Sequence, residues 1–397
     1  MNLNLTEEHL LMQKMVKDFA NNVLAKTASK EDKEKLFPEK NIKKLAELGL
    51  MGVNIPMKYN GSEAGVVAYS LSVTELAKVS ASVAVTMMVT NMAAEIINYF
   101  GTEEQKNRYI PMIMSGKSLT GSFGLSEPGY GSDAGSLKTS AEKKGDYYYI
   151  NGQKAWITNG GYSKVFIVFA RTDKSIKGAK GLSAFLVDSD TDGFVIGKEE
   201  SKMGLKSSST VSLSFDDVKV HKSQLLGNEG DGFKIAMTAL DGGRIGVASQ
   251  ALGIGLGALN EAKNYIKERK QFNKRIADFQ AIQWMVADSE TELEAARLLI
   301  LQAASLKESG KKYSQQAAMA KYFATEVANK VVGKSLQMMG GYGYTEDFNV
   351  ERYYRDVKVT TIYEGTSQIQ QLVIGRNLLK DWSVKLFINL LIFISSI

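Results

Sequence analysis

A carboxylate near the C-terminal end of the chain has the surroundings of a catalytic base. Glu364 stands between Tyr363 and Gly365, in the segment Ile-Tyr-Glu-Gly-Thr-Ser-Gln at 362–368. The residues before it are β-branched, whereas the apolar residues after it recur at helical spacing, which predicts a helix beginning near Gly365. Apolar neighbours would raise the pKa of this carboxylate and make it a stronger base. The alternative is an ordinary glutamate at a helix N-terminus, stabilised by the helix dipole.

Two segments in the middle of the chain contain residues suited to holding a flat, polar ligand. Residues 124–133 (Gly-Leu-Ser-Glu-Pro-Gly-Tyr-Gly-Ser-Asp) form a glycine-rich loop whose hydroxyls and backbone N–H groups could hold a ring edge or a phosphate. Residues 154–160 place the large indole of Trp156 beside the hydroxyl of Thr158. The alternative is a pair of tight turns with a tryptophan in the core.

Composition excludes several kinds of catalytic site. The 397-residue chain has no cysteine, which rules out disulfides, thiolate nucleophiles and cysteine metal sites. Neither of its two histidines stands in a serine or carboxylate motif, so we expect no serine–histidine hydrolysis and no metal site. The net charge of +6 permits an anionic partner, although a lysine-rich solvated surface explains most of it. The first residues lack the basic start and apolar core of a secretory signal, and we therefore expect a cytoplasmic protein.

The order of elements expected from the hydrophobic pattern is helices, then strands, then helices. With 44% apolar and 23% charged residues, the chain has the composition of a globular protein, and its length suits two or three domains. Up to about Ser118 the pattern is helical, with Thr6 and Thr102 as helix caps. From Leu119 to about Gly227 the apolar runs are short and rich in aromatic or β-branched residues. Turn signals separate these runs at 144–146, 151–152, 159–161 and 192–193.

Long helical patterns return after the strands, at 232–267, 277–306, 315–339 and 368–379. This order excludes the strand–helix alternation of a doubly wound nucleotide-binding fold. The glycines at 253, 255 and 257 therefore indicate close packing between helices and not a dinucleotide loop. We predict an α+β protein with an N-terminal α-helical domain (1–118), a middle antiparallel β domain (119–228), a C-terminal α-helical domain (229–385) and an apolar tail (386–397).

Taken in order, these motifs resemble those of the flavin-dependent acyl-CoA dehydrogenases. The glycine-rich loop, the tryptophan segment and the glutamate segment all match, and the similarity extends from about Thr6 to Lys380. The short-chain or butyryl-CoA branch is the most similar. The resemblance implies the acyl-CoA dehydrogenase fold, with a C-terminal four-helix bundle, and a homotetramer built as a dimer of dimers. It also implies FAD as the cofactor and electron-transfer flavoprotein as the electron acceptor.

The reaction implied by the resemblance is α,β-dehydrogenation of an acyl-CoA thioester. Glu364 would remove a proton from the α-carbon while the β-carbon gives a hydride to flavin N5, which yields a trans-2-enoyl-CoA. Long-chain and isovaleryl relatives carry the catalytic glutamate at the position of Gly243, so glycine there agrees with Glu364 as the base. Asp241 and Arg244 match the pair that contacts the CoA portion and supports the acyl site, although the residues alone indicate an ion pair at a helix start.

The family's cofactor and substrate contacts fall on residues that this chain retains. Residues matching the FAD site of one subunit are Phe123, Leu125, Ser126, Gly131, Ser132, Trp156, Ile157, Thr158, Thr366 and Gln368. A second subunit completes that site through residues matching Arg269, Gln271, Phe272, Gln280, Gln337, Gly340 and Gly341. The guanidinium of Arg269 suits a diphosphate. Substrate contacts match Ser132, Asp241, Arg244, Tyr363 and Gly365.

Two other functions remain open at this point. An acyl-CoA oxidase would share the scaffold, but oxidases of this kind usually have an additional C-terminal domain. A noncatalytic, DNA-associated family member is permitted by the basic charge, but intact Glu364 and Arg244 and the lack of a dense Lys/Arg tract oppose it. We expect no nucleic-acid partner.

The acyl chain length and the tail are less well defined. Met87, Met88 and Met92 could fill the acyl pocket and favour short chains, or could be general core. Glu95 on the same segment has no explanation, and the lack of arginine between 71 and 99 argues weakly against glutaryl-CoA. The apolar tail is too short for a normal membrane span. We expect it to be a helix at a subunit contact or a sequence-end artefact in preference to a membrane anchor.

Overall fold

Helices make up the first part of the molecule, as the hydrophobic pattern predicts. The computed structural model describes residues 5–176 and 178–379, so the apolar tail at 386–397 lies outside the described residues. Thr6 and Thr102 each cap a helix, and each forms a reciprocal capping box with the residue three positions later. The helices are α1 (Glu7–Asn22), α2 (Ala28–Lys33), α3 (Glu39–Glu47), α4 (Gly65–Ala77), α5 (Ala81–Phe100) and α6 (Glu103–Met114).

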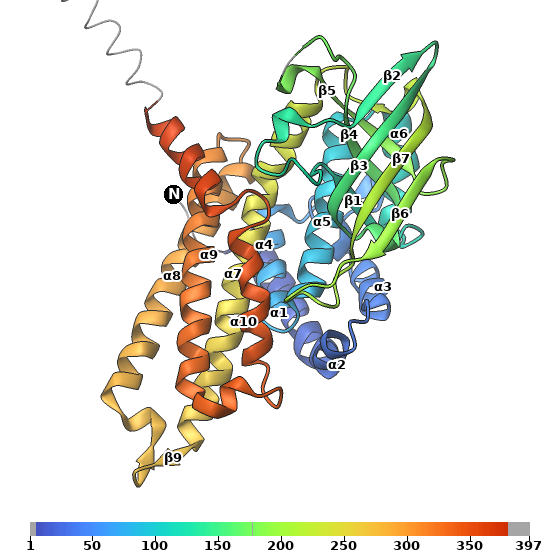
Figure 1. Ribbon diagram of the computed structural model, residues 1–397. Coiled ribbons are helices and arrows are strands. Elements are labelled where there is room, and N and C mark those ends of the chain that lie inside the picture. The colour runs from blue at the N-terminus through green and yellow to red at the C-terminus, as the bar shows by residue number, and fades with distance from the viewer. Residues whose placement is uncertain (1–4, 177, 380–397) are drawn as a thin grey trace, which may run out of the picture.

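Helix α5 is the central core helix of the molecule. It packs against the strand β1 (Thr120–Gly124) on one side and against the long helix α7 (Gly232–Glu268) on the other, as Figure 1 shows. By length and composition α5 is apolar enough to cross a membrane, but 78% of that apolar window is buried inside the protein. Its hydrophobicity is therefore explained by its place between the sheet and the C-terminal helices.

The middle part of the chain forms one eight-stranded sheet in the order β6-β7-β3-β2-β4-β5-β8, with β1 paired to β4. The pairing is antiparallel except that β1 and β2 run parallel to β4, so the predicted antiparallel domain is a mixed sheet with its parallel pairs at an interior strand. The remaining strands are β2 (Ser140–Lys144), β3 (Tyr147–Thr158), β4 (Ser163–Arg171), β5 (Leu182–Asp188), β6 (Phe194–Glu199), β7 (Thr210–His221) and β8 (Leu225–Leu226).

One of the predicted turns is wrong. Residues 144–146 do form the hairpin between β2 and β3, but Asn151 and Gly152 lie inside β3, where the register with β7 shifts in a bulge. Gly152 has a φ of +143°, and a Cβ there would lie 2.6 Å from the Thr139 hydroxyl. The glycine thus allows close approach of two chain segments within a strand, which a short sequence pattern does not distinguish from a turn.

Long helices form the C-terminal part, as the pattern predicts. They are α7, α8 (Gln280–Glu308), α9 (Ser314–Met339) and the helical residues 367–379. A small hairpin of β9 (Lys270–Gln271) and β10 (Lys274–Arg275) connects α7 to α8 at the end of the bundle far from the sheet (Figure 1). The short helix α10 (Val350–Val357) was not predicted, and it leads into the glutamate segment.

The glycines of α7 confirm the interpretation of close helix packing. A Cβ at Gly253 would lie 2.4 Å from the Thr74 carbonyl oxygen of α4, and one at Gly255 would lie 2.8 Å from Leu293 of α8. One at Gly257 would lie 2.5 Å from the Lys78 carbonyl oxygen. These glycines therefore allow α7 to pack directly against two neighbouring helices.

Candidate active site

Glu364 lies at a strained junction between two helical segments. After α10 the chain forms a short 3-10 helix (Lys358–Thr361), and the next helix begins at residue 367, so the expected junction is confirmed. Glu364 has a φ of +56° and Gly365 a φ of +88°. A left-handed glutamate costs about 1–3 kcal/mol, and such strain concentrates at functional sites. The turn therefore requires support from neighbouring groups.

That support comes from hydrogen bonds to the two carbonyl oxygens of the turn. The Gln370 side chain donates to the carbonyl oxygens of Glu364 (3.2 Å) and Gly365 (2.8 Å). Lys321 Nζ of α9 also donates to the Gly365 carbonyl oxygen, at 2.6 Å. These bonds fix the backbone of the turn and do not involve the Glu364 carboxylate.

The Glu364 carboxyl group is poised to exchange a proton near neutral pH. Its Oε2 atom is buried and has no hydrogen-bond partner. Burial raises the pKa of Glu364 to about 7, although the positive charges of Lys321 and Arg244 oppose the increase. Burial also lowers the pKa of Lys321 to about 8, and the Glu364 charge opposes that decrease. A carboxylate in this state is a competent general base at physiological pH.

Two glycines of α7 make room for groups of the site. A Cβ at Gly243 would lie 2.8 Å from Glu364 Oε2. A Cβ at Gly246, one turn further along, would lie 2.6 Å from the Tyr69 hydroxyl and 3.2 Å from the Met88 methyl. Glu364, Tyr69 and Met88 therefore gather over one glycine-lined face of α7.

Asp241 and Arg244 form an ion pair within α7, not at its start. The Ser314 hydroxyl also donates to Asp241, at 3.0 Å, and burial raises the pKa of Asp241. Arg244 is 4% exposed, and its Nε atom is buried without a partner. Tyr363 lies next to this region and donates its hydroxyl hydrogen to Gln250. The site thus combines the carboxylates of Glu364 and Asp241 with the buried cations Arg244 and Lys321.

The glycine-rich loop and the tryptophan segment lie side by side. Ala155 N–H donates to the Ser126 carbonyl oxygen at 2.9 Å, and buried Lys154 donates to the Leu125 carbonyl oxygen at 3.1 Å. Trp156 has a φ of +63° and is 64% exposed, so the tryptophan-in-core alternative is wrong. An exposed indole on strained backbone suggests a ligand that covers it.

The other cofactor residues expected in the sheet and its loop differ in their position and in the exposure of their side chains. Phe123 lies at the end of β1, Gly131 and Ser132 are exposed in the loop, and Thr158 ends β3. The Ile157 side chain is 1% exposed and packs in the core of the sheet, so only its backbone can face a ligand.

The residues expected to complete a second subunit's site lie at the end of the helical bundle that is far from the sheet (Figure 1). A cleft of about 780 Å³ near the β9 hairpin is lined by five of them: Arg269, Gln271, Gln337, Gly340 and Gly341. Phe272 beside it is 87% exposed, and exposed Gln280 begins α8. In Figure 1 this hairpin lies at the bottom of the bundle, away from the sheet. One chain therefore does not bring the two sets of cofactor residues together.

Thr366 and Gln368 follow Glu364 closely in the sequence. The Thr366 hydroxyl accepts a hydrogen bond from Ile369 N–H at 3.3 Å and so caps the helical residues 367–379, while Gln368 is exposed. Both lie within four residues of Glu364 in the sequence. Both therefore lie at the start of the helix that follows Glu364.

Sequence analysis missed Lys321, Tyr69, Gln250 and Gln370. Lys321 offered one usable signal, because it stands in α9 among Ala317, Ala320 and Ala324, which are all fully buried. A lysine on such a small apolar face is costly to bury without a partner. Glu95, which the sequence left unexplained, forms an ion pair with Lys307 at 2.7 Å.

Comparisons with known proteins agree along nearly the whole described chain. Three family models match: the N-terminal domain of acyl-CoA dehydrogenase at residues 6–117, the middle domain at 122–218 and the C-terminal domain at 230–379. The short-chain specific acyl-CoA dehydrogenase of Clostridium acetobutylicum is 46% identical over 94% of this chain and 99% of the relative. The subunit CarC of the caffeyl-CoA reductase–Etf complex of Acetobacterium woodii is 45% identical over 94% of this chain and 99% of the relative.

A solved structure shows the same arrangement. Butyryl-CoA dehydrogenase from Megasphaera elsdenii superposes with a TM-score of 0.93 at 45% identity, covering 96% of this chain and all of that one. The three-part order of helices, sheet and helices is therefore shared with a protein of known activity.

Proposed function

Because this chain belongs to the acyl-CoA dehydrogenase family of flavin-dependent oxidoreductases, we propose that it converts a short- to medium-chain acyl-CoA to the trans-2-enoyl-CoA, with Glu364 as the base. One observation carries the proposal. The Glu364 carboxyl group has a buried, unpartnered oxygen and a pKa raised to about 7 by burial. The α-proton of a thioester needs a base of this kind together with stabilisation of the enolate-like charge.

The residues of the sheet fit the FAD that this family uses. The exposed Trp156 and the adjoining glycine-rich loop offer a flat surface and hydroxyl groups. FAD, when bound, supplies the two-electron oxidant that takes the hydride from the β-carbon. We assign Phe123, Leu125, Ser126, Gly131, Ser132, Trp156, Ile157 (by its backbone), Thr158, Thr366 and Gln368 to its binding in one subunit.

The residues of this chain supply proton transfer and charge stabilisation. Glu364 accepts the α-proton, and Gly243 leaves room for its carboxylate. Within residues 5–176 and 178–379, the Glu364 N–H has no backbone acceptor, so it is available to donate to the thioester carbonyl. Buried Arg244, paired with Asp241, and Lys321 place positive charge near the ionised base. Tyr363 and Gly365 flank the base and complete the proposed substrate contacts with Ser132.

A second copy of the chain would complete the cofactor site. Arg269 in the distant cleft suits the diphosphate, and the other residues that we assign there are Gln271, Phe272, Gln280, Gln337, Gly340 and Gly341. Exposed apolar side chains at this end, Phe272, Trp284 and Tyr344, support coverage by a partner subunit. A homotetramer, built as a dimer of dimers, is the assembly that we propose.

The substrate and the electron acceptor are proposed on less direct grounds. Met88 reaches the glycine-lined face of α7 beside Tyr69, which favours a short acyl chain, as in the relatives named for short-chain and butyryl substrates. The relative named as a subunit of an Etf complex supports electron-transfer flavoprotein as the acceptor. We also place the protein in the cytoplasm and its domains at 1–118, 119–228 and 229–385.

The visible absorption spectrum of the purified protein tests this function. We expect a flavin spectrum that bleaches during anaerobic titration with butyryl-CoA and that persists in the Glu364→Gln variant. Trans-2-butenoyl-CoA should appear in proportion to the flavin bleached. A flavin that no acyl-CoA bleaches would contradict the reaction, and a protein that takes up no FAD on reconstitution would contradict the cofactor assignment.

A further inference from the structure

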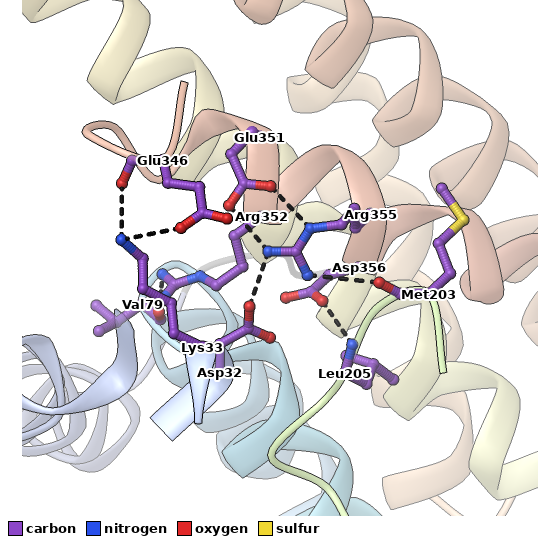
Figure 2. Close-up of polar contacts among 10 residues, drawn as sticks. All are labelled: Asp32, Lys33, Val79, Met203, Leu205, Glu346, Glu351, Arg352, Arg355 and Asp356. Carbon is purple, nitrogen blue, oxygen red and sulfur yellow. Dashed lines mark hydrogen bonds and ion pairs between the residues drawn. The ribbon is translucent and has the colours of Figure 1, made fainter. Parts of the chain in front are cut away.

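The loop between β6 and β7 contains a segment, residues 203–209, that contacts the helix preceding the base; we call this segment the strap. Asp356 of α10 accepts a hydrogen bond from Leu205 N–H at 2.6 Å. Arg355 donates to the Met203 carbonyl oxygen at 3.4 Å. A Cβ at Gly204 would lie 2.5 Å from the Arg355 carbonyl oxygen, so the two backbones are in direct contact. Figure 2 shows the strap running past Asp356 and Arg355.

The other end of the strap is joined to the part of β3 that carries Trp156 and Thr158. The Ser209 carbonyl oxygen accepts a hydrogen bond from Asn159 N–H at 2.9 Å, and its hydroxyl accepts one from Gly161 N–H at 3.1 Å. The next residue, Thr210, pairs with Thr158 in the sheet. The strap contains a hydrogen-bonded turn between Leu205 and Ser208. It therefore connects α10 to the proposed flavin-facing end of β3 through a short segment that is held at both ends.

Helix α10 is itself fixed to the N-terminal helices by buried charges. Arg355 donates to Asp32 of α2 at 2.7 Å and to Glu351 one turn earlier on α10, also at 2.7 Å. Arg352 donates to the Val79 carbonyl oxygen at 2.8 Å. Asp32 and Asp356 are 3% and 2% exposed, so this network holds charge where apolar side chains would be less costly. Its directional bonds fix α10 in position against two other parts of the chain (Figure 2).

A short, well-packed connection links α10 to the base. Thr360 and Thr361 of the 3-10 helix are buried, and Ile362 and Tyr363 N–H groups both donate to the Val359 carbonyl oxygen. Glu364 follows directly. A displacement of α10 would therefore be transmitted to the carboxylate and not absorbed by a slack loop.

We propose that the strap and α10 form a brace that sets the separation between the Glu364 carboxylate and the end of β3 carrying Trp156 and Thr158, with Asp356 and Arg355 as positioning residues. The inference rests on the proposed function, because the separation matters only if proton and hydride leave neighbouring carbons of one substrate. A misplacement of about 1 Å in such a geometry costs roughly 100-fold in rate.

Two variants loosen the brace by independent means. Asp356→Ala removes the acceptor for Leu205 N–H, and Gly204→Ala pushes the strap away from α10 without changing any charge. Asp356→Asn keeps an acceptor oxygen and serves as the conservative rescue. Glu346→Gln is the matched control, because it removes only the exposed ion pair with Lys33 at the edge of the same network (3.3 Å; side chains 46% and 73% exposed).

The first readout separates chemistry from binding. At saturating butyryl-CoA, we expect single-turnover bleaching to slow by at least about tenfold in Asp356→Ala and Gly204→Ala, with flavin content and substrate Kd within about threefold of wild type. Asp356→Asn and Glu346→Gln should bleach at nearly the wild-type rate. Wild-type rates in both loosened variants would overturn the brace. If Asp356→Ala does not fold, Gly204→Ala decides alone.

The second readout does not depend on activity. In amide hydrogen exchange, we expect residues 203–209 and 360–366 to exchange faster together in the loosened variants than in wild type. Faster exchange confined to the strap would overturn the proposal. The exchange result also separates the brace from the proposed function. It tests the brace even if no acyl-CoA bleaches the wild-type protein, which is the outcome that would contradict the proposed function.

Discussion

Glu364 and Lys321 act on each other as a pair of buried, titrating groups. Burial raises the pKa of the carboxyl to about 7 and lowers that of the ammonium to about 8, and each charge opposes the shift of the other. Such a pair titrates jointly, so loss of the lysine charge changes the pKa of Glu364. The lysine also holds the Gly365 carbonyl oxygen, so it supports both the charge and the shape of the turn.

Removing the lysine charge tests this coupling. In Lys321→Met, the positive charge that opposes the raised pKa of Glu364 is lost, so the pKa rises further and the ionised base forms only at higher pH. We expect the pH profile of single-turnover bleaching to move to higher pH, with the rate at pH 7 reduced by about threefold or more. Lys330→Met, also on α9, removes a partly exposed ion pair with Glu292 of α8 and should leave the profile in place. An unchanged or more acidic profile for Lys321→Met would contradict the coupling.

At the scale of elements, α7 supports the site through its glycines, which leave space for other groups, as well as through its polar side chains. Gly243 and Gly246 open one face for Glu364 and Tyr69, whereas Gly253, Gly255 and Gly257 bring the helix against its neighbours. A 37-residue helix tolerates these glycines because tertiary packing, and not local propensity, stabilises it.

The glycine beside the base provides a sharp test of this view. A Cβ at Gly243 would lie 2.8 Å from Glu364 Oε2, so Gly243→Ala should displace the carboxylate and slow bleaching by about 100-fold, while the protein keeps its flavin. Gly333→Ala on α9 is the matched control, because nothing lies within 4 Å of its Cβ. It should bleach normally and melt at the same or a slightly higher temperature, since alanine is the better helix former. Normal bleaching by Gly243→Ala would show that the carboxylate does not occupy this space.

The sequence predicted the long helices well because their apolar spacing extends over many turns. It failed at Asn151 and Gly152, where a turn-like dipeptide serves a bulge inside β3, and at α10, which is too short for periodicity to identify. The segment proposed to carry the base could be singled out because Tyr363, Glu364 and Gly365 are contiguous. Lys321 and Gln370 could not, because their role depends on contacts that only the folded chain makes.

At the scale of the whole molecule, the predicted cofactor residues lie in two groups that one chain keeps apart. Trp156 belongs to the sheet and the glycine-rich loop lies beside it, whereas Arg269 lines the cleft near the β9 hairpin. That hairpin lies at the end of the helices far from the sheet (Figure 1). Assembly would then be a condition for a complete cofactor site, and loss of contact between subunits would weaken flavin binding.

Substitution of the distant arginine tests this division. We expect Arg269→Ala to weaken FAD binding by about tenfold or more, because a charged contact to the diphosphate is lost. The flavin that remains bound should still bleach with butyryl-CoA. Arg297→Ala, which removes an exposed ion pair with Glu294 on α8, is the control and should retain its flavin after dialysis. Equal flavin content in both variants would show that this cleft does not serve the cofactor.

The most direct test of Glu364 as the base is the rate of flavin bleaching measured by rapid mixing with butyryl-CoA and with its α-dideuterated form. For wild type we expect a rate that rises with an apparent pKa near 7 and that falls on α-deuteration, because the α-proton is transferred to a carboxyl group with a pKa of about 7. For Glu364→Gln we expect a rate lower by about 10²–10⁴-fold with flavin still bound. A Glu364→Gln variant that bleaches within about threefold of wild type, with the isotope effect intact, would show that another group removes the proton.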